Sequence, residues 1–327
     1  MGTEVSLQSQ LTLVELAKRT SDGNFLQIAE VLTQINEIMQ DAVWLEANEK
    51  TRHVGTQRTH LPTGSHRTYN AGVSPSASST KQVEESMCTL EDYSIVDEAL
   101  AALSGNPAAF RSQEDYAFLE GMSQTMIGKL FYGNVGTNPE EIDGLATRYN
   151  LTSMANVDGA SGTGSDTTSV WLIEWGPTKA HLIYPQGGVS NTVKMEDLGV
   201  KAHYTAVGSS QTLFQAYITH FKIDYGWFVH DARCVQRMAN VEYTGSANIF
   251  DDDILIDMIS RIPNPSAMGQ ARIYVNRAIW AQMWKYAKDK SNVQYSASNV
   301  AGGPMLSFSG IPIRMCDQIL NTETAIS

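Results

Sequence analysis

Residues 112–150 read SQEDYAFLEGMSQTMIGKLFYGNVGTNPEEIDGLATRYN. Apolar side chains recur three or four positions apart in this stretch, as on one face of a helix. The residues of that face are Tyr116, Leu119, Met122, Met126 and Leu130. Ser112 with Asp115 predicts the beginning of the helix and Gly133 predicts its end. We therefore expect a helix over residues 112–131, about 28 Å long.

The residues that follow have the form of a second helix start. Asn138 is suited to cap the free amides, Pro139 to occupy the first turn, and Glu141 to reach back to the cap. This pattern predicts a short helix that ends near Gly144.

Helical spacing is also present before this stretch, over residues 11–47. Gly23 divides the pattern into a short and a longer helix. The apolar stripe of the longer helix consists of Phe25, Ile28, Leu32, Ile35 and Met39. No core partner lies next to this arm in sequence, so the stripe packs either on its own domain or on another copy of the chain. If it packs on another copy, deletion of residues 11–39 should leave a folded subunit that cannot assemble.

Residues 50–81 differ in composition, because Gly, Ser, Thr, Pro and basic residues dominate and almost nothing could anchor a core. Such a segment is a long loop or an extended hairpin. Long loops in compact domains are usually functional or disordered. Residues 56–59 and 65–69, on either side of residues 61–64, are predicted as the two arms of a protruding hairpin.

The remainder of the chain is mostly strand-like. Residues 170–175 and 180–184 predict a hairpin, and alternating apolar residues predict a strand over 213–229. Two helices follow, one with its apolar face between Ile254 and Ile262 and one capped by Asn276. Residues 306–315 alternate again and predict a closing strand. The order of these elements predicts an α+β fold.

Charge and cysteine content exclude some classes of protein. The formal net charge of the 327 residues is −12, whereas nucleic-acid binders rely on Lys and Arg. Cys88, Cys234 and Cys316 show neither disulfide nor zinc spacing, so we expect buried thiols in a reducing compartment. No apolar run approaches the roughly 20 residues that span a bilayer, and we expect folding in a cytosol.

The sequence contains no recognisable catalytic constellation. The glycines of residues 158–165 lack the Lys and the strand-to-helix context of a nucleotide-binding loop. Asp251, Asp252 and Asp253 could ligate a cation, but they stand where a helix begins and acidic residues cap free amides. The histidines show no metal-ligand spacing. We predict no catalytic, cofactor-binding or metal-binding residues and no enzymatic activity.

Several short segments share a wider pattern. They are residues 130–134, 138–145, 148–150, 13–18 and 310–314, together with Asn48, Asn106, Phe110, Arg111, Glu114, Asp115 and Asp317. In chain order these segments resemble the major capsid proteins of tailed, short-tailed double-stranded DNA bacteriophages. The resemblance implies an α+β fold of the Hong Kong ninety-seven type, in which some relatives rearrange the strand connections.

The resemblance assigns a role to each part of the chain. Residues 1–49 would form the N-terminal arm and 50–86 the extended loop. Residues 87–160 would form the peripheral domain with its spine helix, 161–262 the axial domain, and 263–327 a return to the peripheral domain. The implied function is self-assembly into the icosahedral virion capsid, in the cytoplasm of the bacterial host.

The resemblance also implies partners. The subunit would contact itself in hexamers and pentamers, and packaged DNA without sequence specificity, with no cofactor and no membrane. No Lys lies near the loop tip for the covalent crosslink of some relatives, so noncovalent clamping is expected. Because the arm starts at once, a separate scaffolding protein is implied, besides a portal protein and a cement or decoration protein. Alternatives are a tail or decoration subunit, a cellular encapsulating shell protein, or a cytosolic enzyme.

Charge is segregated around the extended loop. Residues 50–72 carry basic side chains and no acid, whereas residues 84–98 carry acids and no base. In a head-to-tail contact a basic loop can lie on the acidic surface of its neighbour. The predicted contact residues are Arg52, Arg58, His60, Arg67, Glu84 and Glu85, with Ile28, Leu32, Ile35 and Met39 of the arm. Reversing Arg58 and Arg67 should then block assembly, and reversing Glu84 and Glu85 should partly restore it; the alternative is a solvated hairpin.

Overall fold

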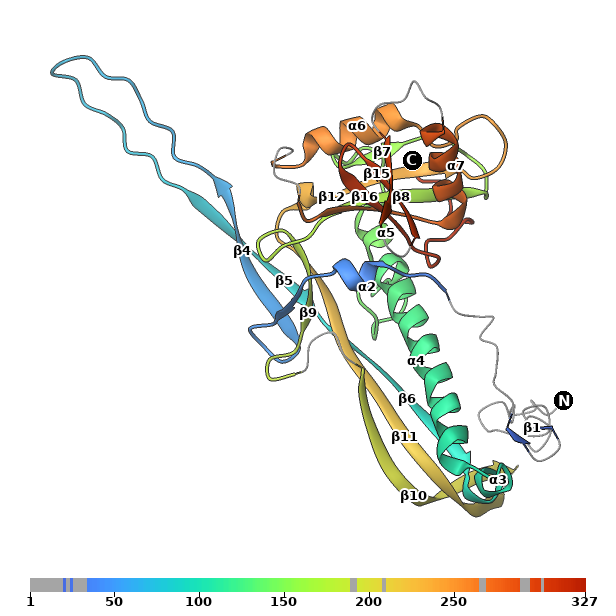
Figure 1. Ribbon diagram of the computed structural model, residues 1–327. Helices are drawn as coiled ribbons and strands as arrows, with labels where there is room; N and C mark the ends of the chain where they lie inside the picture. The colour runs from blue at the N-terminus through green and yellow to red at the C-terminus, as the bar shows by residue number, and fades with distance from the viewer. Residues whose placement is uncertain are drawn as a thin grey trace. The chain divides into compact units, whose positions relative to one another are not determined.

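The apolar face from Tyr116 to Leu130 lies on helix α4, Pro107–Tyr132, which is drawn in green in Figure 1. The helix begins earlier than predicted, because Asn106 accepts a hydrogen bond from the Ala109 amide at 3.2 Å and Pro107 fills the first turn. Ser112 lies inside the helix, so its prediction as the cap was wrong. The end at Gly133 is confirmed: its amide donates to the Lys129 carbonyl at 2.9 Å.

The chain folds back directly after α4. The predicted helix at Asn138 is wrong, and helix α5 comprises Leu145–Arg148 instead. The Gly144 amide donates to the Gly133 carbonyl at 2.9 Å. A Cβ atom on Gly144 would lie 2.5 Å from the Phe131 carbonyl oxygen, so this close backbone contact requires glycine.

The computed structural model describes all residues except 1–19, 22–23, 26–33, 189–192, 208–209, 265–268, 289–294 and 301–302. The chain divides into two units. Unit 1 comprises residues 1–34, 89–127 and 191–224, and unit 2 comprises residues 35–88, 128–190 and 225–327.

Unit 2 contains a seven-stranded sheet in the order β14-β15-β16-β13-β8-β12-β7. The strands are β7 (Val157–Gly159), β8 (Thr167–Glu174), β12 (Val235–Glu242), β13 (Ala271–Val275), β14 (Tyr295–Val300), β15 (Gly303–Phe308) and β16 (Ile311–Met315). One face shares a hydrophobic core with helices α6 (Asp252–Arg261) and α7 (Arg277–Ala287). On the other face Trp171 packs against Phe131 and Tyr149, with ring centroids 6.0 and 6.4 Å apart.

The two helix caps predicted in this unit are confirmed. Asp251 accepts a hydrogen bond from the Asp253 amide at 3.0 Å, and Asn276 accepts one from the Ile279 amide at 2.9 Å. The acidic run therefore begins helix α6, and within the described residues no three His, Cys, Asp or Glu side chains are grouped to hold a metal.

Two strand predictions were wrong in their pairing. β8 pairs with β12 and β13, while β9 (Ala180–Tyr184) pairs with β11 and β3, so residues 170–184 form no hairpin. The predicted closing strand is a hairpin of β15 and β16. In contrast, the long strand is confirmed as β11, Ser210–Val229, in which Phe221, Ile223, Tyr225 and Trp227 are buried.

Unit 1 is built around the first part of β11. β10 (Lys194–Val207) pairs antiparallel with it, and β6 (Cys88–Asp97) also pairs with β11. Helix α3 (Glu98–Leu103) contributes Leu100 and Ala101 to a small core with Val96 and Phe110. The short strands β1 (Thr20–Ser21) and β2 (Asn24–Phe25) pair with each other.

The predicted helical arm is largely wrong where the structure describes it. Helix α2 covers only Ile38–Asp41, and β3 (Trp44–Glu46) is a strand, because it pairs parallel with β9. Ile38 is fully buried, whereas Ile35 is 45% exposed and Met39 is half-buried. Ile28 and Leu32 lie outside the described residues.

The sheet and the two units cross the boundaries of the predicted domains, and those domains stay a prediction. The sheet takes β7 from before residue 161, β8 and β12 from residues 161–262, and β13 to β16 from after them. Residues 191–224 of the predicted axial domain belong to unit 1. Cys88, Cys234 and Cys316 are buried free thiols, as predicted. Within the described part of the chain, no helix is long and apolar enough to cross a membrane.

Candidate assembly site at the root of the β4–β5 hairpin

The extended loop forms an antiparallel hairpin of β4 (Arg52–His60) and β5 (Ser79–Ser86), as Figure 1 shows. The hairpin is confirmed, but the second predicted arm, residues 65–69, is not a strand. Residues 61–78 form an irregular tip, in which Pro62 and Pro75 lack the amide hydrogen that a strand ladder requires. The tip exposes large apolar side chains: Leu61 is 67%, Tyr69 is 98% and Val73 is 49% exposed.

The root of the hairpin lies directly on the end of β11. An added Cβ atom on Gly55 would lie 2.3 Å from Cζ of Phe228, so the β4 backbone rests on this buried ring. The Gln57 side-chain amide donates to the His230 carbonyl at 2.6 Å and to the Val229 carbonyl at 3.4 Å. A glycine within a strand signals such close approach.

Three histidines surround the same phenylalanine. The ring centroids of His53, His181 and His230 lie 4.6, 5.2 and 5.4 Å from that of Phe228. His181 is 1% exposed, and neither of its ring nitrogens makes a hydrogen bond of ordinary geometry within the described residues. Burial lowers the pKa of His181 to about 4, reinforced by His53 and His230 and opposed by the Gly176 backbone. Burial, and then the charge of His230, also lowers the pKa of His53.

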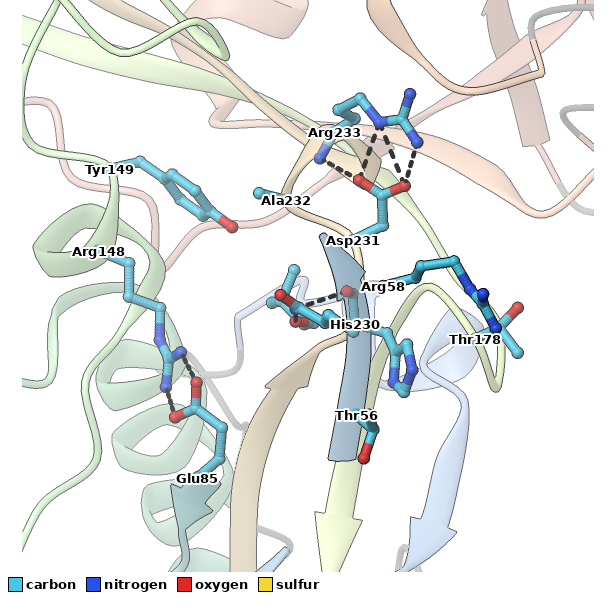
Figure 2. Close-up of a pocket in the computed structure, with 12 residues that line it drawn as sticks. Thr56, Arg58, Glu85, Arg148, Tyr149, Thr178, His230, Asp231, Ala232 and Arg233 are labelled. Atoms are coloured by element: carbon cyan, nitrogen blue, oxygen red, sulfur yellow. Dashed lines mark hydrogen bonds and ion pairs between the residues drawn. The ribbon is translucent and has the colours of Figure 1, made fainter. Parts of the chain in front are cut away.

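A cavity of about 680 Å³ lies beside the root, lined by residues of β4, β5, α5 and the turn after β11. Figure 2 shows Arg148 paired directly with Glu85 on one side of this cavity, with two nitrogen–oxygen distances of 2.5 and 2.7 Å. Arg233 binds Asp231 at 2.7 Å, and this hydrogen bond lowers the pKa of Asp231. The charges that line the cavity are thus mostly paired, which suits a structural junction between elements.

Some of the predicted contact residues form ion pairs within the chain, and others are exposed. Arg52 binds Glu49 and Glu84 of its own chain, each at 2.6 Å, and Glu85 binds Arg148. Glu84 and Glu85 therefore already have partners within the chain, and their role as the acidic partner of a neighbour stays a prediction. Arg58, His60 and Arg67 are exposed, and the Arg58 guanidinium has no ion pair among the described residues.

Sequence reasoning missed Gly55, Arg148, His181 and Phe228 as parts of the site. Only Gly55 carried a usable signal, because it interrupts a strand pattern. The others are brought to the root by pairing between distant strands.

Replacing Gly55 with Ala should lower the free energy of unfolding of the unassembled subunit by about 1–3 kcal/mol, because the added methyl overpacks the Phe228 ring. Urea denaturation measures the change. Gly64 on the same hairpin has no atom within 4 Å of its added Cβ, so Gly64→Ala is the matched control and should not destabilise. Equal stability of the two variants would contradict the close contact.

The fold, with its arm, extended hairpin, long helix and mixed sheet, is the Hong Kong ninety-seven type of phage coat-protein fold. A chain in the structure of bacteriophage Epsilon15 matches this chain with a TM-score of 0.70 and 30% sequence identity, over 99% of each chain. The chain belongs to the family of the major capsid protein GP7, whose model matches residues 20–327.

Two further solved structures match with lower sequence identity. The capsid of bacteriophage JBD30 matches over 94% of this chain and 99% of that chain, with 8% identity and a TM-score of 0.48. The SrpI encapsulin of Synechococcus elongatus matches over 72% of this chain and 97% of that chain, with 9% identity and a TM-score of 0.42. A search of curated proteins gave no match. The protein is thus a shell-forming major capsid protein, a structural component of the virion capsid, as the sequence predicted.

Proposed function

We propose that copies of this subunit form the hexamers and pentamers of an icosahedral shell around phage DNA, and that each β4–β5 hairpin clamps a neighbour without a covalent bond. The exposed apolar tip carries the proposal. Leu61, Tyr69 and Val73 are solvated on their own chain, whereas large apolar side chains contribute most when an interface buries them.

A groove in unit 1 is the acceptor that fits the hairpin of the next copy. Its volume is about 360 Å³, and it lies between β6 and α4. Phe118 and Met122 contribute apolar surface, and the exposed Glu91 and Asp92 contribute negative charge. Unlike Glu84 and Glu85, Asp92 has no ion pair among the described residues, so it is available to a basic loop. Glu91 already forms an ion pair with Lys222, in which the nitrogen and oxygen lie 3.1 Å apart.

The other partners are supported by general features of the chain. A net charge of −12 opposes tight binding of phosphates, so we propose that the packaged DNA is enclosed by the shell without sequence-specific binding. We propose a separate scaffolding protein, a portal protein and a cement or decoration protein as further partners. Three buried free thiols fit assembly in a reducing bacterial cytoplasm. We propose no catalytic role, because the charges in the cavity are engaged in structural pairs.

Reversing Arg58 and Arg67 to Glu should reduce shell assembly by at least tenfold without unfolding the subunit. Exposed ion pairs contribute only about 0–1 kcal/mol each, but every subunit of a shell repeats them. Assembly is measured by sedimentation and electron microscopy, and folding by circular dichroism. Because exposed charges are screened beyond about 8 Å at physiological salt, the wild-type contact should also weaken at high salt.

A charge exchange tests the proposed acceptor. Asp92→Arg should also reduce assembly, and combining it with Arg67→Asp should restore part of the yield. Glu84→Lys is the control, because Glu84 is occupied by Arg52 and its reversal should not rescue the Arg58 and Arg67 variant. Normal shells from the variant with Arg58→Glu and Arg67→Glu at low salt would rule out the electrostatic clamp.

A further inference from the structure

The three histidines at the hairpin root form a cluster around Phe228, in which burial favours the neutral rings of His181 and His53. They come from three different segments: His53 from β4, His181 from β9, and His230 from the end of β11. His53 and His181 face each other edge to face, with centroids 6.0 Å apart, and both contact Phe228. The hairpin therefore covers a buried imidazole with a second imidazole.

The charged groups around the cluster would do little to stabilise a protonated histidine. The neighbouring carboxylates are paired as Glu85–Arg148, Asp231–Arg233, Glu174–Lys179, and Glu49 and Glu84 with Arg52. Arg58 adds an unpaired positive charge to the cavity beside His230. An imidazolium at His181 would thus be buried next to two other imidazoles, and no carboxylate is among the groups that shift the pKa of His181.

We propose that this cluster is an acid-sensitive latch: protonation of His181 and His53 releases the β4–β5 hairpin from the end of β11. The root is also held by the Gly55 backbone on Phe228, by the hydrogen bond from Gln57 to the His230 carbonyl, and by the Glu85–Arg148 ion pair. Asn48 exchanges two further hydrogen bonds with Val54. Release of the hairpin must break these contacts as well, and repulsion between protonated histidines acts against them. The latch does not depend on which surface of a neighbour the hairpin binds.

The direction of the pH dependence follows from proton binding. His181 has a pKa of about 4 when docked and the ordinary value of 6.5 when solvated, so the released hairpin binds more protons. The contact between the hairpin and the end of β11 is therefore fully stable above pH 6.5 and weakens as the pH falls toward 4. At pH 5 the equilibrium between docked and released hairpin should shift by about 30-fold toward release, from His181 alone.

The test uses the unassembled full-length subunit with spin labels on Thr59→Cys and Ser260→Cys, since the native thiols are buried. The distance distribution should be narrow at pH 8 and gain a broad released population at pH 5. A second label pair, Ser260→Cys with Lys285→Cys, should not change. Broadening of this second pair as well would mean general unfolding and would overturn the latch.

Two variants separate the cluster from other histidines. His181→Leu should keep the hairpin docked at pH 5, whereas His66→Gln, at an exposed position of the tip, should behave as wild type. If His181→Leu does not fold, an NMR titration of the imidazole signals of the wild-type protein tests the proposal instead. A His181 ring that titrates near 6.5 while the hairpin stays docked would also overturn the proposal.

Discussion

Replacing Glu323 with Ala should lower the free energy of unfolding of the subunit by about 3–5 kcal/mol, because it leaves a buried arginine without its partner. The side chains of Arg237 and Glu323 are 3% and 5% exposed, and their nitrogen and oxygen lie 2.9 Å apart. Removal of one member of a buried pair is far more costly than replacement of both.

The surrounding hydrogen bonds increase this effect. Ser169 and Tyr132 each donate to the Glu323 carboxylate at 2.5 Å, and both lose this acceptor in the Ala variant. Arg237 also donates to the Tyr149 carbonyl at 2.6 Å. Burial, followed by the Glu323 charge, raises the pKa of Tyr132 well above its usual value, so its hydroxyl stays a donor. One carboxylate thus connects α4, α5, the central strands and the C-terminal segment.

Glu323→Gln is the matched variant, since it keeps the size of the side chain and removes only its charge. Its loss of stability should be smaller than that of Glu323→Ala. Urea denaturation of the unassembled subunit measures both. A loss below about 1 kcal/mol for the Ala variant would show that water or a rearranged neighbour replaces the carboxylate.

The sequence predicted elements whose signals are local. The spacing of apolar residues in α4, the alternation in β11, and the caps Asp251 and Asn276 all depend on neighbours within a few positions. The start of α4 was misplaced because Ser112 and Asp115 imitate a cap inside the helix, while Asn106 and Pro107 form the real one.

Pairing between distant segments could not be predicted in the same way. β8 and β9 are close in sequence and rich in apolar residues, yet they join different strands. The arm was predicted to be helical by its spacing, but β3 pairs with β9, and tertiary contacts override such local preference. The basic hairpin of the candidate site could be predicted from its composition. Its acidic partners could not, because the sequence does not show which carboxylates already form ion pairs within the chain.

Replacing the hairpin tip should abolish shell assembly while the subunit remains folded. In the variant, residues 61–78 give way to Asn-Gly, a two-residue turn that suits the pairing of His60 with Ser79. The tip makes few contacts with the rest of its chain, so the stability of the subunit should change by no more than about 0.5 kcal/mol.

The size of the effect on assembly follows from the apolar side chains that are lost. Burying one large apolar side chain contributes roughly 1.5–3 kcal/mol, so the three at the tip would contribute roughly 4.5–9 kcal/mol to each contact. A loss of this size lowers each association constant by more than about 100-fold. Electron microscopy and sedimentation should then detect free subunits or small oligomers in place of closed particles.

A second variant distinguishes the side chains from the length of the loop. Leu61→Ser, Tyr69→Ser and Val73→Ser together keep the length and the basic residues of the tip, and should reduce assembly nearly as strongly as the shortened loop. If the triple variant assembles normally while the shortened loop does not, the backbone or the charges of the tip make the contact. Closed shells from both variants would show that the hairpin does not hold the neighbour, and that the exposed apolar tip has another role.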